Sequence, residues 1–152
     1  MKPEKHPRIA VRAVIVQNGK LLLVNAWPGG QSDLLCAPGG GVRLGASLPD
    51  NLIREVYEET GLTIEVEAPC LVNEFHDPDR AFHQVEVFFR CRVKGSSEIS
   101  KAWRDIDEVV SEHYWLSVNE VETRRVKPDL LKKIAFDPAL PFSYDPLERV
   151  LF

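Results

Sequence analysis

Hydrophobic and polar residues alternate most regularly over residues 83–93. Apolar side chains take every second position from Val85 to Val93, and the positions between them carry polar residues and Phe88. Because successive side chains of a strand point to opposite faces of a sheet, this period of two predicts a β-strand. β-branched and small residues alternate in a similar way over residues 8–16, which predicts a second strand.

Turn signals and short apolar runs predict the rest of the sheet. Asn18-Gly19 is typical of a two-residue hairpin turn, so residues 20–27 should pair with residues 8–16. Further strands are predicted over residues 34–37, 62–68, 71–75 and 112–116. Gly39-Gly40-Gly41 indicates either a plain tight turn or a place where the backbone comes close to a ligand.

A helix is predicted between Ser47 and Gly61. Ser47 can cap the first turn and Pro49 fits within it, because the first backbone N–H groups of a helix have no intrahelical partner. Gly61 provides the usual C-terminal stop. Further helical segments are expected over residues 118–121 and 129–136.

These elements predict one domain of the α/β or α+β class, built on a mixed sheet with two helices. The length of 152 residues suits a single domain over residues 1–152, and 44% hydrophobic residues are enough for a complete core. We place that core within residues 8–136. Residues 137–152 contain three prolines and are expected to form an irregular tail on the surface.

Composition excludes several classes of function. The net charge of −4 argues against a surface for double-stranded nucleic acid. No apolar run is long enough to span a membrane, and residues 1–7 lack the apolar stretch of a signal peptide. The three cysteines form no CxxC pair and lie beside apolar residues, so buried thiols and a cytoplasmic location are expected.

Three carboxylates crowd one side of the predicted helix. Glu55, Glu58 and Glu59 project within an arc of roughly 100°, away from the apolar stripe of the helix. Like charges at this spacing repel, and each exposed negative charge near a helix C-terminus costs about 0.3–1 kcal/mol. Bound Mg²⁺ or Mn²⁺ would remove this conflict, because hard cations bind carboxylate oxygens. The alternative is a solvated acidic face that Arg54 partly neutralises.

The spacing of these residues resembles the signature of the Nudix hydrolase family. That signature runs Gly, five residues, Glu, seven residues, then Arg-Glu-aliphatic-x-Glu-Glu-x-Gly-aliphatic. Gly40 takes its first position here, and residues 54–62 match its second half at each defined position. The resemblance covers roughly residues 8–136 and implies an α/β/α sandwich with a mixed central sheet. The family has Glu at the position of Ala46.

The resemblance implies a metal-dependent hydrolase of a nucleoside diphosphate linked to another group. Glu55, Glu58 and Glu59 would bind Mg²⁺ or Mn²⁺, with the Gly40 carbonyl as an extra ligand, and Arg54 would orient the glutamates. The metal would shield phosphate charge and acidify a bound water, and Glu55 is the candidate general base. The expected partner is a small nucleotide-type pyrophosphate, and a homodimer stays open.

In some family members a further acid comes from a loop that precedes the last strands. The acids available at that place are Asp105, Asp107, Glu108 and Glu112. We prefer Glu108 on position as a third catalytic residue, although each of these acids also fits a solvated loop.

Two features leave alternatives open. Ala46 removes one partner of Arg54, so a catalytically weak Nudix domain that serves as a nucleotide-binding sensor or interaction module is the second hypothesis. Trp27, Phe75 and Phe82 flank loops, where they could stack on a base or simply pack against neighbouring side chains.

Overall fold

The computed structural model describes residues 6–152, so the first five residues of the predicted domain, and most of the N-terminal segment discussed above, lie outside the described part. Within this range the strands are β1 (Arg8–Gln17), β2 (Lys20–Asn25), β3 (Leu35–Cys36), β4 (Gly39–Gly41), β5 (Thr63–Asp77), β6 (Phe82–Lys94), β7 (His113–Ser117) and β8 (Ser143–Arg149). The α-helices are α1 (Leu48–Thr60), α2 (Val118–Val121) and α3 (Leu130–Phe136), and the short 3-10 helices are Pro28–Gly30 and Pro78–Arg80.

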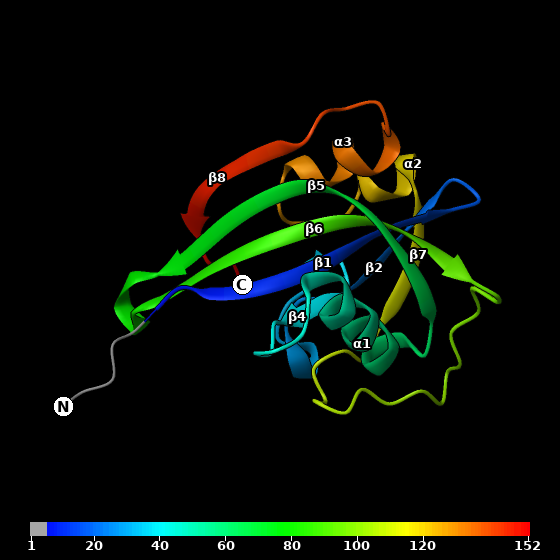
Figure 1. Cartoon of the computed structure of the whole chain (residues 1–152), viewed down its shortest axis with the longest axis horizontal. Helices are drawn as coiled ribbons and strands as arrows, with labels where there is room; N and C mark the ends of the chain where they lie inside the picture. The colour runs from blue at the N-terminus through cyan, green and yellow to red at the C-terminus, as the bar shows by residue number, and fades with distance from the viewer. Residues whose placement is uncertain (1–5) are drawn as a thin grey trace.

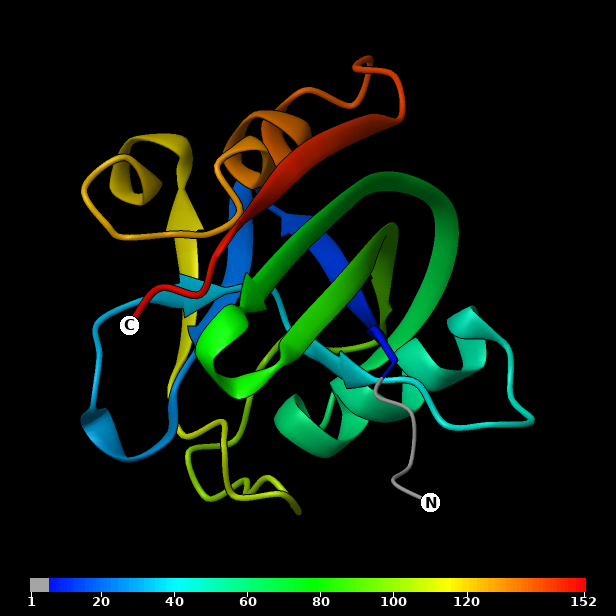
Figure 2. The same cartoon turned by 90° about the vertical axis from the view of Figure 1, so that its left-hand side faces the viewer.

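The strands form a mixed sheet in the order β3-β2-β1-β6-β5-β8, with β4 paired to β1 and β7 paired to β2. The β1–β6 and β5–β8 pairs are parallel, whereas β1–β2 and β5–β6 are antiparallel. Helix α1 lies on one side of the sheet and α2 and α3 lie on the other (Figures 1 and 2). The expected α/β/α sandwich with a mixed central sheet is therefore confirmed.

Both faces of the sheet are buried by apolar side chains. Leu52 and Val56 of α1 pack against a cluster that includes Val11 of β1. On the other face, Leu131 of α3 packs in a cluster that includes Phe88 of β6. The neighbouring residues Phe88 and Phe89 of β6 belong to these two different cores, as the period of two predicts.

Most predicted elements are present, and two of the predicted strands are joined into one. The Asn18-Gly19 hairpin is confirmed, since Val16 pairs with Leu21 across it. The strands predicted over 62–68 and 71–75 form the single strand β5, whose pairing with β6 shifts on either side of Pro69. Because proline has no N–H to donate, it interrupts the ladder without ending the strand.

The prediction of an irregular tail over residues 137–152 is wrong. Ser143–Arg149 forms β8, which pairs in parallel with β5 at the edge of the sheet. Pro146 is tolerated there because an edge strand leaves one side of its backbone unpaired. Asp145 of β8 is buried and accepts a hydrogen bond from the Leu130 N–H at 3.0 Å. The tail therefore supplies a cap for the start of α3, whose own N-cap residue Asp129 makes no side-chain cap bond.

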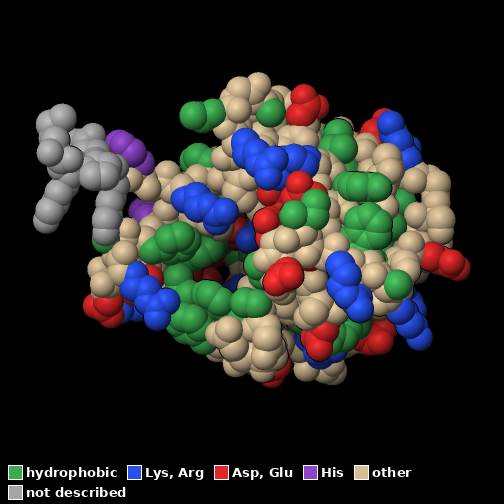
Figure 3. All heavy atoms as spheres, turned by 90° about the horizontal axis from the view of Figure 1, so that it is seen from below, with side chains coloured by type: hydrophobic (Ala, Val, Ile, Leu, Met, Phe, Trp, Pro, Cys, Tyr) green, Lys and Arg blue, Asp and Glu red, His purple; other side chains and the backbone are tan. Residues whose placement is uncertain are grey.

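The surface and the cysteines add little constraint on function. Lys, Arg, Asp and Glu side chains are interspersed on the face seen from below, where hydrophobic side chains gather around a hollow (Figure 3). None of the described helices has both the length and the apolar character needed to cross a membrane. Cys70 and Cys91 are buried free thiols as expected, whereas Cys36 is half-buried.

We expect Asp145→Ala to lower the free energy of unfolding by about 1 kcal/mol, the usual cost of losing an N-terminal helix cap. Asp129→Ala is the matched control, because Asp129 is exposed and its one side-chain partner among residues 6–152 is Lys127, with which it forms an ion pair. Denaturant unfolding of both variants measures the difference. Equal losses would show that Asp145 does not act as the cap.

Candidate active site

Helix α1 is fixed at both ends, as the sequence predicts. Ser47 Oγ accepts a hydrogen bond from the Asp50 N–H at 3.1 Å. Gly61 takes a left-handed conformation with φ of 76° and donates its N–H to the Tyr57 carbonyl at 2.8 Å. Since the apolar stripe of α1 packs on the sheet, Glu55 and Glu59 are turned inward and are each only 7% exposed.

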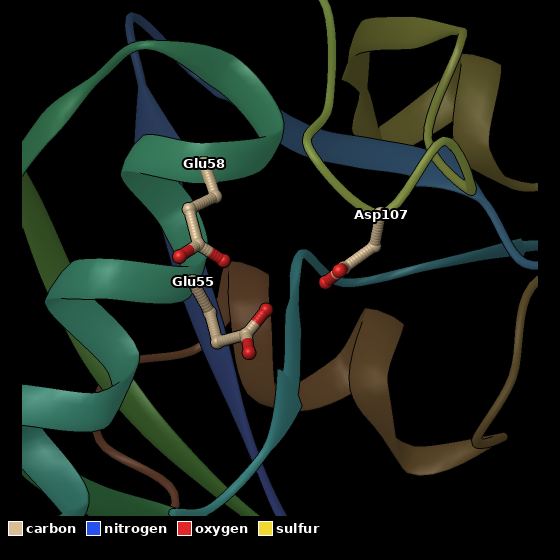
Figure 4. Close-up of side chains that lie close together, drawn as sticks. All are labelled: Glu55, Glu58 and Asp107. Carbon is tan, nitrogen blue, oxygen red and sulfur yellow. The ribbon is translucent and has the colours of Figure 1, made fainter.

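Two of the predicted metal ligands meet an acid from a distant loop. Oxygens of Glu55, Glu58 and Asp107 all lie within 4.8 Å of one another. Figure 4 shows the glutamates pointing from α1 toward the Asp107 carboxylate on the facing loop. Three convergent carboxylates are the donor set that Mg²⁺ and Mn²⁺ prefer, so these residues fit a hard divalent cation.

The loop acid that lies beside Glu55 and Glu58 is Asp107, and not Glu108, which the sequence position favoured. The Asp105 carboxylate is buried and accepts hydrogen bonds from the Asp107 N–H at 3.1 Å and the Val110 N–H at 2.9 Å. This turn presents Asp107 to α1, while Glu108 adopts a φ of 57° and lines a separate cavity. The Asp105-x-Asp107 spacing was a usable signal, because aspartate often accepts from the N–H two residues ahead.

The loop that carries Asp107 is docked onto the end of α1. Trp103 Nε1 donates to the Glu58 carbonyl at 2.9 Å, and its ring meets the Tyr57 ring edge-on at 5.3 Å between centroids. A Cβ on Gly61 would lie 2.9 Å from the Trp103 ring. Gly61 therefore serves twice, as the helix stop and as the surface on which Trp103 rests.

Glu59 has different surroundings from the other two glutamates. One of its oxygens accepts a hydrogen bond from the Gly39 N–H at 3.1 Å. Burial raises the pKa of Glu59 to about 8, although the charge of Arg12 and the Gly39 N–H act in the opposite direction. In this structure Glu59 ties α1 to β4, and its role as a metal ligand stays a prediction.

Gly39 and Gly40 bring β4 close to both β1 and α1. A Cβ on Gly39 would lie 1.9 Å from the Val11 carbonyl oxygen, and one on Gly40 would lie 2.5 Å from Glu55 Oε2. The three glycines thus form a strand that lies against the carboxylates, and not a plain turn. This contact places the Gly40 backbone beside the cluster, where its carbonyl was predicted to act as a ligand.

Arg54 is held without the signature glutamate. Its guanidinium donates to Glu55 Oε1 at 2.9 Å, to Glu58 Oε2 at 3.3 Å and to Asn51 Oδ1 at 3.0 Å. Asn51 is buried; its oxygen also accepts from the Arg43 N–H and its amide donates to the Ala46 carbonyl. Asn51 therefore connects the loop to Arg54 although the side chain at position 46 is only a methyl group.

A sequence profile of the NUDIX domain matches residues 6–135. The chain belongs to the Nudix family. An ADP-ribose pyrophosphatase of Methanocaldococcus jannaschii is 31% identical over 90 residues, which are 59% of this chain and 53% of that protein. A MutT-like protein of Streptomyces ambofaciens is 29% identical over 140 residues, covering 91% of this chain and 82% of that protein.

The fold comparison agrees with the sequence match. The solved structure of a Nudix hydrolase from Nitrosomonas europaea superposes with a TM-score of 0.69 at 25% identity, covering 84% of this chain and 85% of that chain. The alignment with the archaeal pyrophosphatase, in contrast, spans only about half of that relative's length. Family and fold are thus established for this Nudix domain.

Substitutions of Gly39 and Gly40 by alanine should have different effects on stability and on metal binding. Gly39→Ala should lower stability by about 2 kcal/mol or more, because its Cβ meets backbone that cannot yield without parting β4 from β1. Gly40→Ala should keep the fold, because the three atoms nearest its Cβ belong to the end of the flexible Glu55 side chain, but weaken Mn²⁺ binding about tenfold. Thermal unfolding and calorimetric titration with Mn²⁺ separate these effects. Unchanged Mn²⁺ binding by Gly40→Ala would contradict the proposed contact.

Stability should also depend on the protonation of Glu59. Its pKa is raised from 4.5 to about 8 on folding, so between these pH values the folded protein holds a proton that the unfolded chain has released. Stability in the presence of EDTA should therefore fall as pH rises through this window and level off above it. Glu59→Gln removes the titrating group but keeps an acceptor for the Gly39 N–H.

Denaturant unfolding across this pH window tests the effect. The Glu59→Gln variant should have a flatter profile than the unsubstituted protein and exceed its stability near pH 8. If both proteins have the same slope, Glu59 is ionised in the folded state and the assignment is wrong.

Proposed function

We propose that this Nudix protein hydrolyses a pyrophosphate bond in a nucleoside diphosphate linked to another group, and that it requires Mg²⁺ or Mn²⁺. The observation that carries the proposal is the meeting of Glu55, Glu58 and Asp107 beside the glycine strand β4. A cation held by these carboxylates would neutralise phosphate charge and lower the pKa of a bound water.

The residues around the cluster supply the remaining requirements. Burial raises the pKa of Glu55, and the adjacent Arg54 only partly offsets this. A more basic carboxylate is a better proton acceptor near neutral pH, which supports Glu55 as the general base. Arg54 bonds both Glu55 and Glu58, so it orients the two carboxylates and limits their mutual repulsion.

The sensor hypothesis loses its main support. It rested on Ala46 leaving Arg54 with one partner fewer, and Asn51 accepts a hydrogen bond from Arg54 at 3.0 Å. Glu108 and Glu59 remain secondary candidates, for catalysis and for metal binding respectively. Since one relative is named an ADP-ribose pyrophosphatase, ADP-ribose belongs in a first substrate panel together with nucleotide sugars, dinucleoside polyphosphates and nucleoside triphosphates.

The test measures phosphate release from this panel, coupled to a phosphatase, with Mg²⁺ or Mn²⁺ and with EDTA. We expect release only with metal. Glu55→Gln should lower kcat by about 100-fold or more, because it removes both a metal ligand and the proton acceptor. Glu65→Gln, on the exposed part of β5, is the control and should match the unsubstituted protein. Metal-dependent release that is unaffected by Glu55→Gln would refute the assignment of the base, and silence across the panel would refute the hydrolase.

A further inference from the structure

The far end of the β5–β6 hairpin carries two histidines on one face of the sheet. His76 of β5 and His83 of β6 are direct cross-strand partners, and the alternation along β6 puts them on the same face as Val87, which packs against the core under α1. The hairpin extends beyond α1 (Figure 1), and both histidines are partly exposed. Opposed side chains of an antiparallel pair have Cβ atoms about 5 Å apart, so the two rings can bind one ligand together.

The separation of the two rings is close to the one that a shared metal ion requires. The ring centroids of His76 and His83 are 6.3 Å apart, and the ring planes are inclined at 55°. Two imidazoles bound to one tetrahedral Zn²⁺, with Zn–N bonds of about 2.1 Å, have centroids roughly 5 Å apart. Because both side chains are partly exposed, a small rotation about their side-chain bonds closes the remaining difference of about 1 Å.

Glu74 orients the ring of His83. Its Oε1 lies 3.0 Å from His83 Nε2, and the Tyr144 O–H donates to its other carboxylate oxygen. An ionised carboxylate only accepts hydrogen bonds, so the proton of this pair is on Nε2 of His83. The neutral ring therefore presents an unprotonated Nδ1, which can bind a metal ion. A histidine that donates its other N–H to a carboxylate is the usual arrangement at metal sites, because the carboxylate fixes the tautomer and the ring orientation.

Strand β8 supports the same group of residues from the edge of the sheet. Tyr144 of β8 holds Glu74, and the Val150 N–H donates to the His76 carbonyl at 3.0 Å. Arg149 pairs with His76 in the β5–β8 ladder and lines a cavity on the opposite face of the sheet. The backbone of His76 and the carboxylate of Glu74 are thus both fixed by β8 and the residue that follows it.

The chemistry of the ligands distinguishes this pair from the carboxylate cluster. Within residues 6–152, the potential metal ligands that converge as a group of three within 4.8 Å are Glu55, Glu58 and Asp107, whose oxygens suit a hard cation. Imidazole nitrogens instead suit Zn²⁺, Ni²⁺ and Cu²⁺. Since His76 and His83 supply two ligands, water would complete the coordination of an ion bound between them.

We propose that His76 and His83 form a binding site for a divalent transition-metal ion such as Zn²⁺, separate from the carboxylate cluster, and that Glu74 is the positioning residue of this site. A bound ion ties β5 to β6 at the open end of the hairpin and, through Glu74 and Tyr144, to β8. The site does not depend on the proposed hydrolysis, because its residues lie beyond α1 at the far end of the hairpin.

The experiment titrates the protein with Zn²⁺ in the presence of excess Mg²⁺ and follows the NMR signals of the imidazole rings. We expect the signals of His76 and His83 to shift together, with one midpoint. His113 reports on the carboxylate helix, because its Nε2 contacts the Glu59 carbonyl at 2.8 Å. A shift confined to His113, separate midpoints for His76 and His83, or no shift of either signal would overturn the proposal.

His76→Gln and His83→Gln test the pair. Each variant should lower the affinity for Zn²⁺ about tenfold or more, measured on the signal of the histidine that remains, because two ligands on one ion become a single ligand. Both side chains are partly exposed, so the melting temperature in EDTA should stay close to that of the unsubstituted protein. Unchanged affinity in either variant would show that the two histidines do not share an ion.

Glu74→Gln tests the positioning residue. It removes the charge that fixes the His83 ring, so the affinity for Zn²⁺ should fall about tenfold. Glu65→Gln is the matched control, because it is the same substitution on the same strand and Glu65 pairs with Arg92. Zn²⁺ should also raise the melting temperature of the unsubstituted protein by more than that of His83→Gln. A lower melting temperature of Glu74→Gln in EDTA with unchanged Zn²⁺ affinity would mean that Glu74 is only structural.

Discussion

The close approach of β4 to its neighbours is the constraint on which the rest of the site depends. Gly39 lies so near the Val11 carbonyl that a Cβ has no room, and its N–H bonds Glu59 of α1. The next residue, Gly40, lies against the Glu55 carboxylate. The sheet, the glycine strand and the helix are thus in direct backbone or side-chain contact. Any movement of β4 would shift the carboxylates that face Asp107.

The loop before α1 shows how a missing signature residue can be tolerated. A glutamate at position 46 would add a negative charge near Arg54, but Arg54 already has acceptors in Glu55, Glu58 and Asn51. Asn51 also bonds the backbone at Arg43 and Ala46, which closes the loop with a neutral side chain. The guanidinium is therefore oriented by groups on its own helix, and the geometry of the carboxylates does not need the absent side chain.

Local sequence patterns predicted the helices and strands well, whereas contacts between residues far apart in the chain could not be predicted from them. The caps at Ser47 and Gly61 and the hairpin at Asn18-Gly19 depend on neighbouring residues, so the sequence alone was sufficient for them. Position alone did not select Asp107 over Glu108. The Asp105-x-Asp107 spacing signals the turn, but the meeting of Asp107 with Glu55 and Glu58 depends on how the distant loop lies against α1. Strand β8 was missed because its proline argues against a strand unless the partner edge is known.

The alternation of side chains in β6 also distinguishes the two faces of the sheet, in addition to predicting a strand. Residues of one parity contribute Phe89 to the core under α1, and residues of the other parity contribute Phe88 to the core under α3. A strand buried on both faces is normally apolar throughout, so Gln84 and Glu86 mark the part of the second face that no helix covers. On this part of the face Arg8 donates to Gln84, and Arg12 donates to Glu86. Packing thus holds one face of the sheet rigid, and hydrogen bonds hold part of the other face rigid. A cavity remains between β6 and the segment around Phe152.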